Sequence, residues 1–411
     1  MLGAQPLPFI ASLLILLLSA RILGEVFEHF AKPAMIGEVL AGVLIGPAVL
    51  GFLSISPAVK VISDLGVFLL VVLAGLEIGF DELRNSLRSK YLWISILGFA
   101  IPFLSGFGIG YLFQYNLVFS IFLGLCIAIT ALPVSVRILM DLGKLQTNIG
   151  RQIISAAVFN DVVALLILGI ILDLEKDKQN ALSLPMLIGL TVLKIALLVG
   201  MVVALYQFFK YTKKRVKAFG YNIDRAILYL KSKESLFAFV IVFVLFFASA
   251  TELLGLHFII GAFFGAMIIS PDILGKRNYL KVKNNTSGIT MGFLAPIFFA
   301  SIGLEFNFGA IQNIGLLLII LFASLASKLV GGYLGARMGG FSKDESFTVG
   351  VGLNARGIME LVIANIALAN NFIDRSMYSI LVLMGILTTL VTPILLKNAF
   401  ARVDKHKHAV R

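Results

Sequence analysis

The chain has 411 residues, of which 59% are hydrophobic and 14% are charged, with a mean hydropathy of +1.00 and a formal net charge of +12. One water-soluble core of this size cannot bury so much apolar surface, which excludes a soluble globular protein and indicates a polytopic membrane protein. The single cysteine, Cys126, excludes an intramolecular disulfide framework and a cysteine-based metal cluster.

Thirteen apolar segments are each long enough to be considered as spans of a hydrocarbon core of about 30 Å. The first is interpreted as a span and not as a removable signal, because it has no basic n-region. In chain order the expected spans are 8–30, 33–52, 58–80, 91–113, 117–141, 149–173, 184–209, 235–255, 257–274, 287–308, 314–338, 346–369 and 375–398.

The basic residues are distributed unevenly between alternate loops. One side of the membrane receives 25 Lys and Arg residues, and the other receives only Lys60, Lys176, Lys178 and Arg375. The positive-inside rule then predicts that the N-terminus is outside and the C-terminus is in the cytoplasm. The plasma (inner) membrane is the expected location. The net charge of +12 is thus explained by topology and does not indicate nucleic-acid binding. The longest basic loop, 210–233, is expected to lie along the anionic inner leaflet.

Two short motifs occur twice. Gly-Leu-Glu closes span 3 at Glu77 and span 10 at Glu305, and GVLIG at 42–46 in span 2 is echoed by GAFFG at 261–265 in span 9. Each partner lies seven spans downstream, an odd number, so the two copies cross the membrane in opposite directions. We therefore predict an all-α fold of two inverted six-span repeats, a construction typical of secondary transporters. The alternative is that both glutamates are ordinary interfacial residues.

The expected organisation follows from these repeats. The first repeat occupies residues 1–183, and residues 184–234 hold span 7 and the basic cytoplasmic loop. The second repeat occupies 235–399, and 400–411 form a cytoplasmic tail.

Spans 5 and 12 correspond in the two repeats, and both carry helix breakers at mid-depth. Span 5 has Thr130 and Pro133, and span 12 has Asn354 between Gly352 and Gly357. Proline removes a backbone donor and frees carbonyl groups near Ile129 and Thr130. Such groups survive in a membrane only if they are buried in protein or line a wet cavity, where they can also bind a cation. A single proline kink without function is the alternative for each span taken alone.

Asp161 of span 6 lies about 12 residues into its span, roughly 18 Å along the helix axis and near the bilayer centre. An ionised carboxylate there costs at least about 2.5 to 3.5 kcal/mol, which makes Asp161 a candidate ion-binding residue. One carboxylate can hold either a proton or an alkali cation, and this competition is sufficient for exchange. Asn160 either ligates the ion or braces the broken helix.

Further charged residues lie inside the spans. Arg356 and Glu360 of span 12 are four residues apart and can pair on one helix face, and Arg356 can compensate freed carbonyl groups. Lys194 and Lys328 are intramembrane by count, but their long stems allow them to snorkel to an interface. His257 is expected at an interface.

Four ordered stretches resemble the monovalent cation:proton antiporter superfamily, in the branch of plant cation/proton exchangers and bacterial sodium or potassium exchangers. They are PAMIGEVLAGVLIGPAVLG, FLLVVLAGLEIGFDELRNS, ITALPVSVRILMDLG and SAAVFNDVVALLILG. The resemblance implies crossed half-helices, an elevator-like movement and a homodimer. It makes Asp161 the ion-binding aspartate, with Asn160 and Thr130 beside it as candidates for Na+ or K+ ligation. Arg356 matches the region of the superfamily's basic residue in span 12.

Pro133, Ser155, Asn354, Arg356 and Glu360 are expected to support the site. The chain departs from electrogenic sodium/proton relatives, because Asn160 replaces the first of two aspartates and span 10 lacks their lysine. Another branch has a glutamate where this chain has Ala156. These departures favour one-for-one, electroneutral exchange.

The expected function is therefore a Na+/H+ antiporter without a cofactor. K+/H+ antiport or K+ efflux is the first alternative, and a passive cation channel is the second. An enzyme is disfavoured because no nucleophile, metal cluster or cofactor loop is evident.

Overall fold

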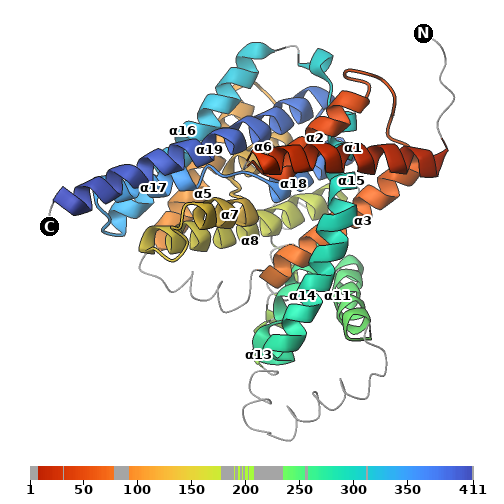
Figure 1. Cartoon of the computed structure of the whole chain (residues 1–411), viewed down its shortest axis with the longest axis horizontal. Helices are drawn as coiled ribbons and strands as arrows, with labels where there is room; N and C mark the ends of the chain where they lie inside the picture. The colour runs from red at the N-terminus through yellow and green to blue at the C-terminus, as the bar shows by residue number, and fades with distance from the viewer. Residues whose placement is uncertain are drawn as a thin grey trace, which may run out of the picture. The chain divides into compact units, whose positions relative to one another are not determined.

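The computed structural model describes residues 8–30, 32–77, 92–176, 189, 193–194, 197, 200–201, 203–207, 235–254, 258–311 and 313–409. All regular secondary structure in these residues is helical (Figure 1). In the first half, the helices are α1 (Phe9–His29), α2 (Ala34–Ile45), α3 (Pro57–Glu77), α5 (Leu92–Leu112), α6 (Leu117–Ala128), α7 (Leu132–Asp141) and α8 (Asn148–Lys176). In the second half, they are α11 (Ser235–Leu253), α12 (Phe258–Ile268), α13 (Pro271–Leu274), α14 (Lys276–Ile289), the π-helical turn Thr290–Leu294, α15 (Ala295–Glu305), the 3₁₀ turn Phe308–Ala310, α16 (Ile314–Met338), α17 (Lys343–Gly352), α18 (Ile358–Ala369) and α19 (Arg375–Ala409).

Among the described residues, eight helical segments have the length and hydropathy of membrane spans. Four shorter apolar helices, α2, α6, α12 and α18, accompany them. The all-helical membrane fold is therefore confirmed, while the number of thirteen spans stays a prediction. Most of expected span 7, the basic loop 210–233 and His257 lie outside the described residues.

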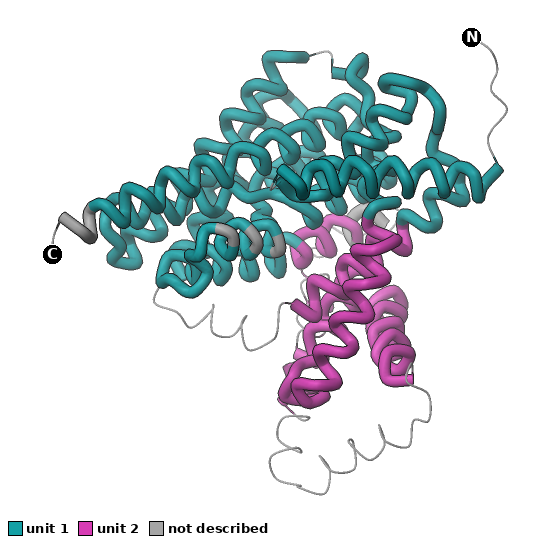
Figure 2. Tube along the Cα trace, viewed as in Figure 1, with its two compact units in different colours: residues 1–63, 83–164, 296–411 teal, residues 64–82, 165–295 magenta. Residues whose placement is uncertain are grey.

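The chain forms two compact units (Figure 2). The first contains residues 1–63, 83–164 and 296–411, and the second contains 64–82 and 165–295. Each unit draws on both predicted repeats, so units and repeats are different divisions of the chain. The repeat boundaries at 183, 234 and 399 stay predictions.

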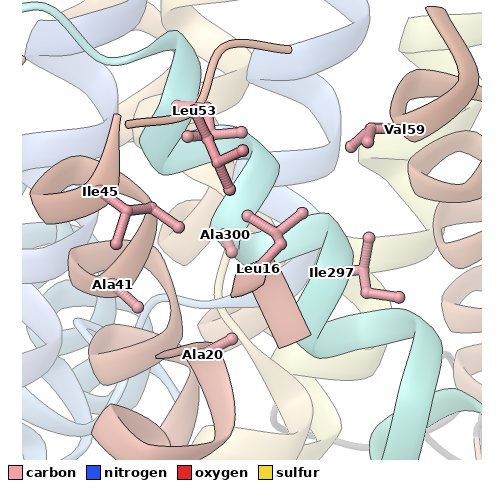
Figure 3. Packing of buried hydrophobic residues seen from close by; sticks show 9 residues of the cluster. Leu16, Ala20, Ala41, Ile45, Leu53, Val59, Ile297 and Ala300 are labelled. Atoms are coloured by element: carbon pink, nitrogen blue, oxygen red, sulfur yellow. The ribbon is translucent and has the colours of Figure 1, made fainter. Parts of the chain in front are cut away.

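Part of the first unit is built on α1, α2 and α15. Nine buried apolar residues pack together there, from α1, α2, the segment into α3, and α15 (Figure 3). They are Leu16, Ala20, Ala41, Ile45, Leu53, Val59, Ile297, Ala300 and Leu304. The side chains are small or aliphatic, which allows α2 to lie close to both of its neighbours.

Glycines set two close helix crossings. A Cβ on Gly42 of α2 would overlap the backbone of Ala300 in α15, and a Cβ on Gly303 would overlap the backbone of Val39 in α2. Within the second unit, Gly75 of α3 meets the backbone of Phe263 in α12 in the same way. Membrane helices associate by such close packing at small residues, because lipid is as apolar as the protein interior. Gly75 and Gly303 belong to the two Gly-Leu-Glu motifs, of which the first lies at the end of the described part of α3, at Glu77, and the second ends α15 at Glu305.

Helix α16 packs along α5 in the first unit. A Cβ on Gly331 would overlap the carbonyl group of Leu97, so the two backbones are in contact at this level. Lys328 lies three residues before Gly331, on the face of α16 that is buried. The close approach of α5 and α16 therefore carries the lysine side chain into the protein and not toward lipid.

Candidate ion-binding site

Two interrupted helices meet in the first unit. Helix α6 ends at Ala128 and α7 begins at Leu132, with extended backbone between them at Ile129 and Ala131. Pro133 lies in the first turn of α7, where its missing N–H has no intrahelical role. The second interruption separates α17 from α18, at residues 353–357. The breaks predicted in spans 5 and 12 are thus both present.

The two interruptions bond to one another. The N–H of Ala131 donates to the carbonyl oxygen of Ala355 (2.8 Å), and the Thr130 hydroxyl lies 3.1 Å from the carbonyl oxygen of Leu353, to which it donates. Gly357 is required at this contact, because a Cβ there would lie 2.7 Å from the Cβ of Ala131. Backbone groups that the broken helices cannot satisfy internally are thereby partly satisfied across the crossing.

Arg356 compensates the end of α6. Its guanidinium donates to the carbonyl oxygens of Cys126 and Ile127, the second at 2.8 Å, and it lies 3.7 Å from Glu360. The two charged side chains are at most 1% exposed. Both sequence predictions for Arg356, the pair with Glu360 and the contact with freed carbonyl groups, are confirmed. A cation at the C-terminal end of α6 also complements the helix dipole.

Lys328 was expected either inside the membrane or, by snorkelling, at an interface, and the structure shows the first. It does not snorkel: its side chain is 0% exposed, and its ammonium donates to Thr130 Oγ1 (2.7 Å), to the Gly98 carbonyl (3.1 Å) and to the Ala128 carbonyl. The signal was present in the sequence, since Ser324, Ser327, Gly331 and Gly332 flank this lysine. Small residues on one face of a membrane helix indicate close packing against another helix.

Asn160 and Asp161 of α8 lie at the same crossing. In the orientation that satisfies both ends of the Asn160 amide, its nitrogen donates to the Ala156 carbonyl (3.2 Å) and its oxygen accepts from the Lys328 ammonium (3.3 Å). The same oxygen lies 3.1 Å from the Thr130 hydroxyl, whose single proton is donated either to it or to the Leu353 carbonyl. Asp161 is 2% exposed and interacts electrostatically with Lys328. Its Oδ1 is buried without a hydrogen-bond partner among the residues that the structure describes.

Two basic and two acidic side chains are buried around the crossing. Lys328 interacts electrostatically with Asp161, Glu360 and Arg356, which joins two cationic and two anionic side chains in one buried group. Removing charged side chains from water is costly unless they are paired. The four side chains therefore stabilise one another only while all of them are present. Asp161 differs from Glu360 because it has no arginine partner within the described ion pairs.

The remaining predicted residues are arranged as follows. Asn354 is 3% exposed and donates to the Gly350 carbonyl (3.1 Å), which braces the end of α17. Its Oδ1 has no partner in the described part of the chain. Ser155 lies on α8, partly buried, one to two turns before the Asn160–Asp161 pair. Their functional roles stay predictions.

These features define a class of protein. A bundle of membrane helices in which two broken helices cross beside buried, oppositely charged residues is the architecture of a secondary ion transporter. The sequence profile described as "Sodium/hydrogen exchanger, transmembrane" matches residues 10–401. The chain belongs to the sodium/hydrogen exchanger family.

Known proteins of high coverage are similar to this chain. The Na+/H+-K+ antiporter GerN of Bacillus cereus is 31% identical over 97% of each chain, and a Na+/H+ antiporter of Enterococcus hirae is 31% identical over 95% of this chain and 97% of its own. The sodium proton antiporter MjNhaP1 of Methanocaldococcus jannaschii has a similar fold, with a TM-score of 0.71 at 14% identity, covering 95% of this chain and 96% of its own.

Proposed function

We propose that this monovalent cation/proton antiporter exchanges Na+ for H+, with the two ions competing for Asp161. The observation that carries the proposal is a buried carboxylate, with one oxygen lacking a hydrogen-bond partner among the described residues, beside two crossing broken helices. Such a carboxylate near the bilayer centre is a site for an ion by default. Support for Na+ comes from the names of the two similar bacterial antiporters.

Coupled exchange follows from the free-energy cost of moving an ionised Asp161 that has no bound ion. An ionised, unoccupied Asp161 is expensive to carry through an apolar barrier, whereas a protonated or cation-bound Asp161 is not. Only the loaded carrier then changes access, and each crossing moves one proton or one cation. Both loaded forms carry the same charge, so exchange is electroneutral as long as Lys328 keeps its proton throughout.

Thr130 is proposed as the second ligand of the cation. Its hydroxyl donates to Leu353 and accepts from Lys328, and an oxygen of this type has a second lone pair. Asn160 holds Lys328 and the α8 backbone in place, and Arg356 with Glu360 holds the end of α6. Because Lys328 brings an ammonium to the crossing from α16, the lack of a lysine in span 10 says nothing about stoichiometry. The proposed electroneutrality rests on one carboxylate, Asp161, binding both ions in turn.

K+/H+ exchange is the alternative. It is supported by the name of the similar Na+/H+-K+ antiporter GerN, which includes both cations. A homodimer in the cell membrane, with its N-terminus outside and its C-terminus in the cytoplasm, completes the proposal. The resemblance to the antiporter superfamily supports the dimer, and the distribution of Lys and Arg supports the orientation.

The test is transport by purified protein in liposomes with an imposed pH gradient, comparing Na+, K+ and Li+. Asp161→Asn keeps the shape of the side chain and removes its charge, so cation-dependent proton flux is expected to vanish. Asp272→Asn is the matched control, because Asp272 is an exposed carboxylate on α13. Full exchange by Asp161→Asn would overturn the assignment, and a cation conductance without coupled proton flux would indicate a channel.

Competition and stoichiometry have their own measurements. With pH varied on both sides together, the apparent KM for the cation should rise about tenfold per pH unit where protons occupy the site, while maximal turnover changes less. A KM that stays flat while activity falls would exclude simple competition. A membrane potential set with valinomycin, with Na+ as substrate, should drive no uphill proton movement; if it does, exchange is electrogenic.

A further inference from the structure

An apolar groove lies within the second unit, whereas Asp161 belongs to the first. It has a volume of about 430 Å³ and is lined by residues of α3, α11, α12 and α14, among them Leu65, Phe68, Leu245, Phe258 and Ile289. The rings of Phe68 and Phe258 lie 6.4 Å apart. Leu65, Leu245 and Ile289 are 50%, 45% and 42% exposed, so the lining residues face outward as well as inward.

The groove follows the length of α11. Lining residues recur on this helix from Phe237 through Ile241, Leu245 and Ala248 to Glu252. Fifteen residues of helix correspond to about 22 Å, so the groove is long, narrow and parallel to a membrane-spanning helix. In a bilayer, the apolar molecules around such a helix are lipids. Its shape suits one extended acyl chain.

The two ends of the groove carry opposite charge. Glu252 lines one end, near the end of α11. Toward the other end, Arg277, Lys281, Asn285 and Ile289 form one row along α14 at four-residue spacing, and all four are exposed, while Val282, Thr286 and Thr290 beside them are buried. Lys281 and Arg277 precede Ile289 by about 12 Å and about 18 Å along the axis.

The basic turn of α14 is held in position against α3. Lys283 lies 3.5 Å from Glu77, and the Tyr279 hydroxyl donates to the Leu76 carbonyl oxygen. Leu65 and Phe68 of the same helix α3 line the groove. The charged row and the apolar groove therefore belong to one packed assembly. A molecule with a long apolar chain and an anionic head matches both parts, whereas a phosphate at the Glu252 end would be repelled.

We propose that this groove binds one anionic phospholipid, with an acyl chain between α3, α11 and α14 and its phosphate against Arg277 and Lys281. The basic residues lie at the end of the span that the positive-inside rule assigns to the cytoplasm, where anionic lipids are concentrated. The site is separate from Asp161, so the lipid stabilises the second unit without taking part in ion binding.

The test uses the purified, delipidated full chain in detergent and titrates it with dioleoyl phosphatidylglycerol or dioleoyl phosphatidylcholine. Bound lipid is counted by native mass spectrometry, and the shift in Tm is recorded. Phosphatidylglycerol is expected to bind more tightly and to raise Tm more. Arg277→Gln and Lys281→Gln should each weaken its binding about fivefold, equivalent to the roughly 1 kcal/mol that one basic residue contributes near an anionic surface.

Variants inside and outside the groove distinguish a specific lipid site from nonspecific binding of lipid to the protein surface. Leu245→Trp should fill the groove and abolish the tight binding, whereas Val242→Trp should not, because Val242 is 63% exposed on α11 and does not line the groove. Glu252→Gln should leave phosphatidylglycerol affinity unchanged. Asp161→Asn should bind lipid normally even if it transports nothing.

Four results would overturn the proposal. Equal binding of the two lipids, or full binding by the double variant Arg277→Gln/Lys281→Gln, would remove the anionic headgroup site. Tight binding by Leu245→Trp would show that the lipid lies elsewhere on the surface. Weaker binding of phosphatidylcholine in Glu252→Gln, without an effect on phosphatidylglycerol, would indicate a zwitterionic lipid held by its ammonium group at the other end.

Discussion

The substitution Lys328→Met tests the geometry of the crossing most directly. Methionine keeps an unbranched stem and removes the ammonium, which donates to Thr130, Gly98 and Ala128. Hydrogen bonds to a charged group contribute about 1.5 to 3 kcal/mol each, but the gain is partly offset by the cost of burying the charge. Removing one member of a buried charged group costs about 3 to 5 kcal/mol, and we expect a loss of this size in the free energy of unfolding.

Arg337→Met is the matched control. Arg337 lies on the same helix, is exposed and donates one hydrogen bond to the Phe341 carbonyl, so its loss should cost less than about 1.5 kcal/mol. The measurement is denaturant unfolding in mixed micelles, with m-values checked for two-state behaviour. Equal losses for Lys328→Met and Arg337→Met would contradict the buried position of Lys328.

The double variant Lys328→Met/Asp161→Asn measures the coupling between the two side chains. Without Lys328, the Asp161 carboxylate loses an opposite charge with which it interacts. Neutralising both should therefore cost at least about 1 kcal/mol less than the sum of the single losses, since interacting sites depart from additivity by about 0.5 to 3 kcal/mol. Additivity within about 0.5 kcal/mol would refute the interaction.

Three further outcomes are expected. Asn160→Asp adds a second carboxylate at the crossing and should change the charge moved per cycle, measured as a potential-driven flux in liposomes; an unchanged stoichiometry would show that Asn160 does not set the charge count. Gly303→Ala should lower Tm strongly because its Cβ meets the α2 backbone, whereas Gly288→Ala, with open space around it, should keep or raise Tm. Glu360→Gln removes the carboxylate that pairs with Arg356 and should lower the free energy of unfolding by about 3 kcal/mol. The transport stoichiometry should stay the same; a changed voltage response would instead make Glu360 a titrating group.

Much of the candidate site was accessible from local sequence features. A charged residue in the middle of an apolar run is conspicuous whatever its neighbours are, so Asp161 was identified by position alone. The interruptions at Thr130 and Asn354 were predicted because proline and glycine act on the backbone locally. The pair of Arg356 and Glu360 followed from four-residue spacing on one helix. Each of these inferences required knowledge of a single span.

The partners across the crossing depended on the tertiary structure. Thr130 and Lys328 are separated by 198 residues, and Arg356 and Cys126 by 230. No helical period predicts such contacts, because they arise from which faces of α5, α6, α16 and α18 meet. The sequence therefore left open whether Lys328 is buried in the membrane or reaches an interface by its long stem, although the small residues beside it indicated a packed face.

The amino-acid sequence by itself determined that this is an all-helical membrane protein, that two of its spans are broken, and that a carboxylate, Asp161, lies within an apolar helix. Hydropathy, backbone breakers and isolated charges are properties of single segments, and the bilayer acts on each segment separately. Only the tertiary structure decided that Lys328 joins Thr130 and Asn160, and that α2 and α15 touch at Gly42 and Gly303. In water, an apolar stripe reveals the buried face of a helix. In lipid both faces are apolar, so the buried face is set by close packing and polar contacts between helices.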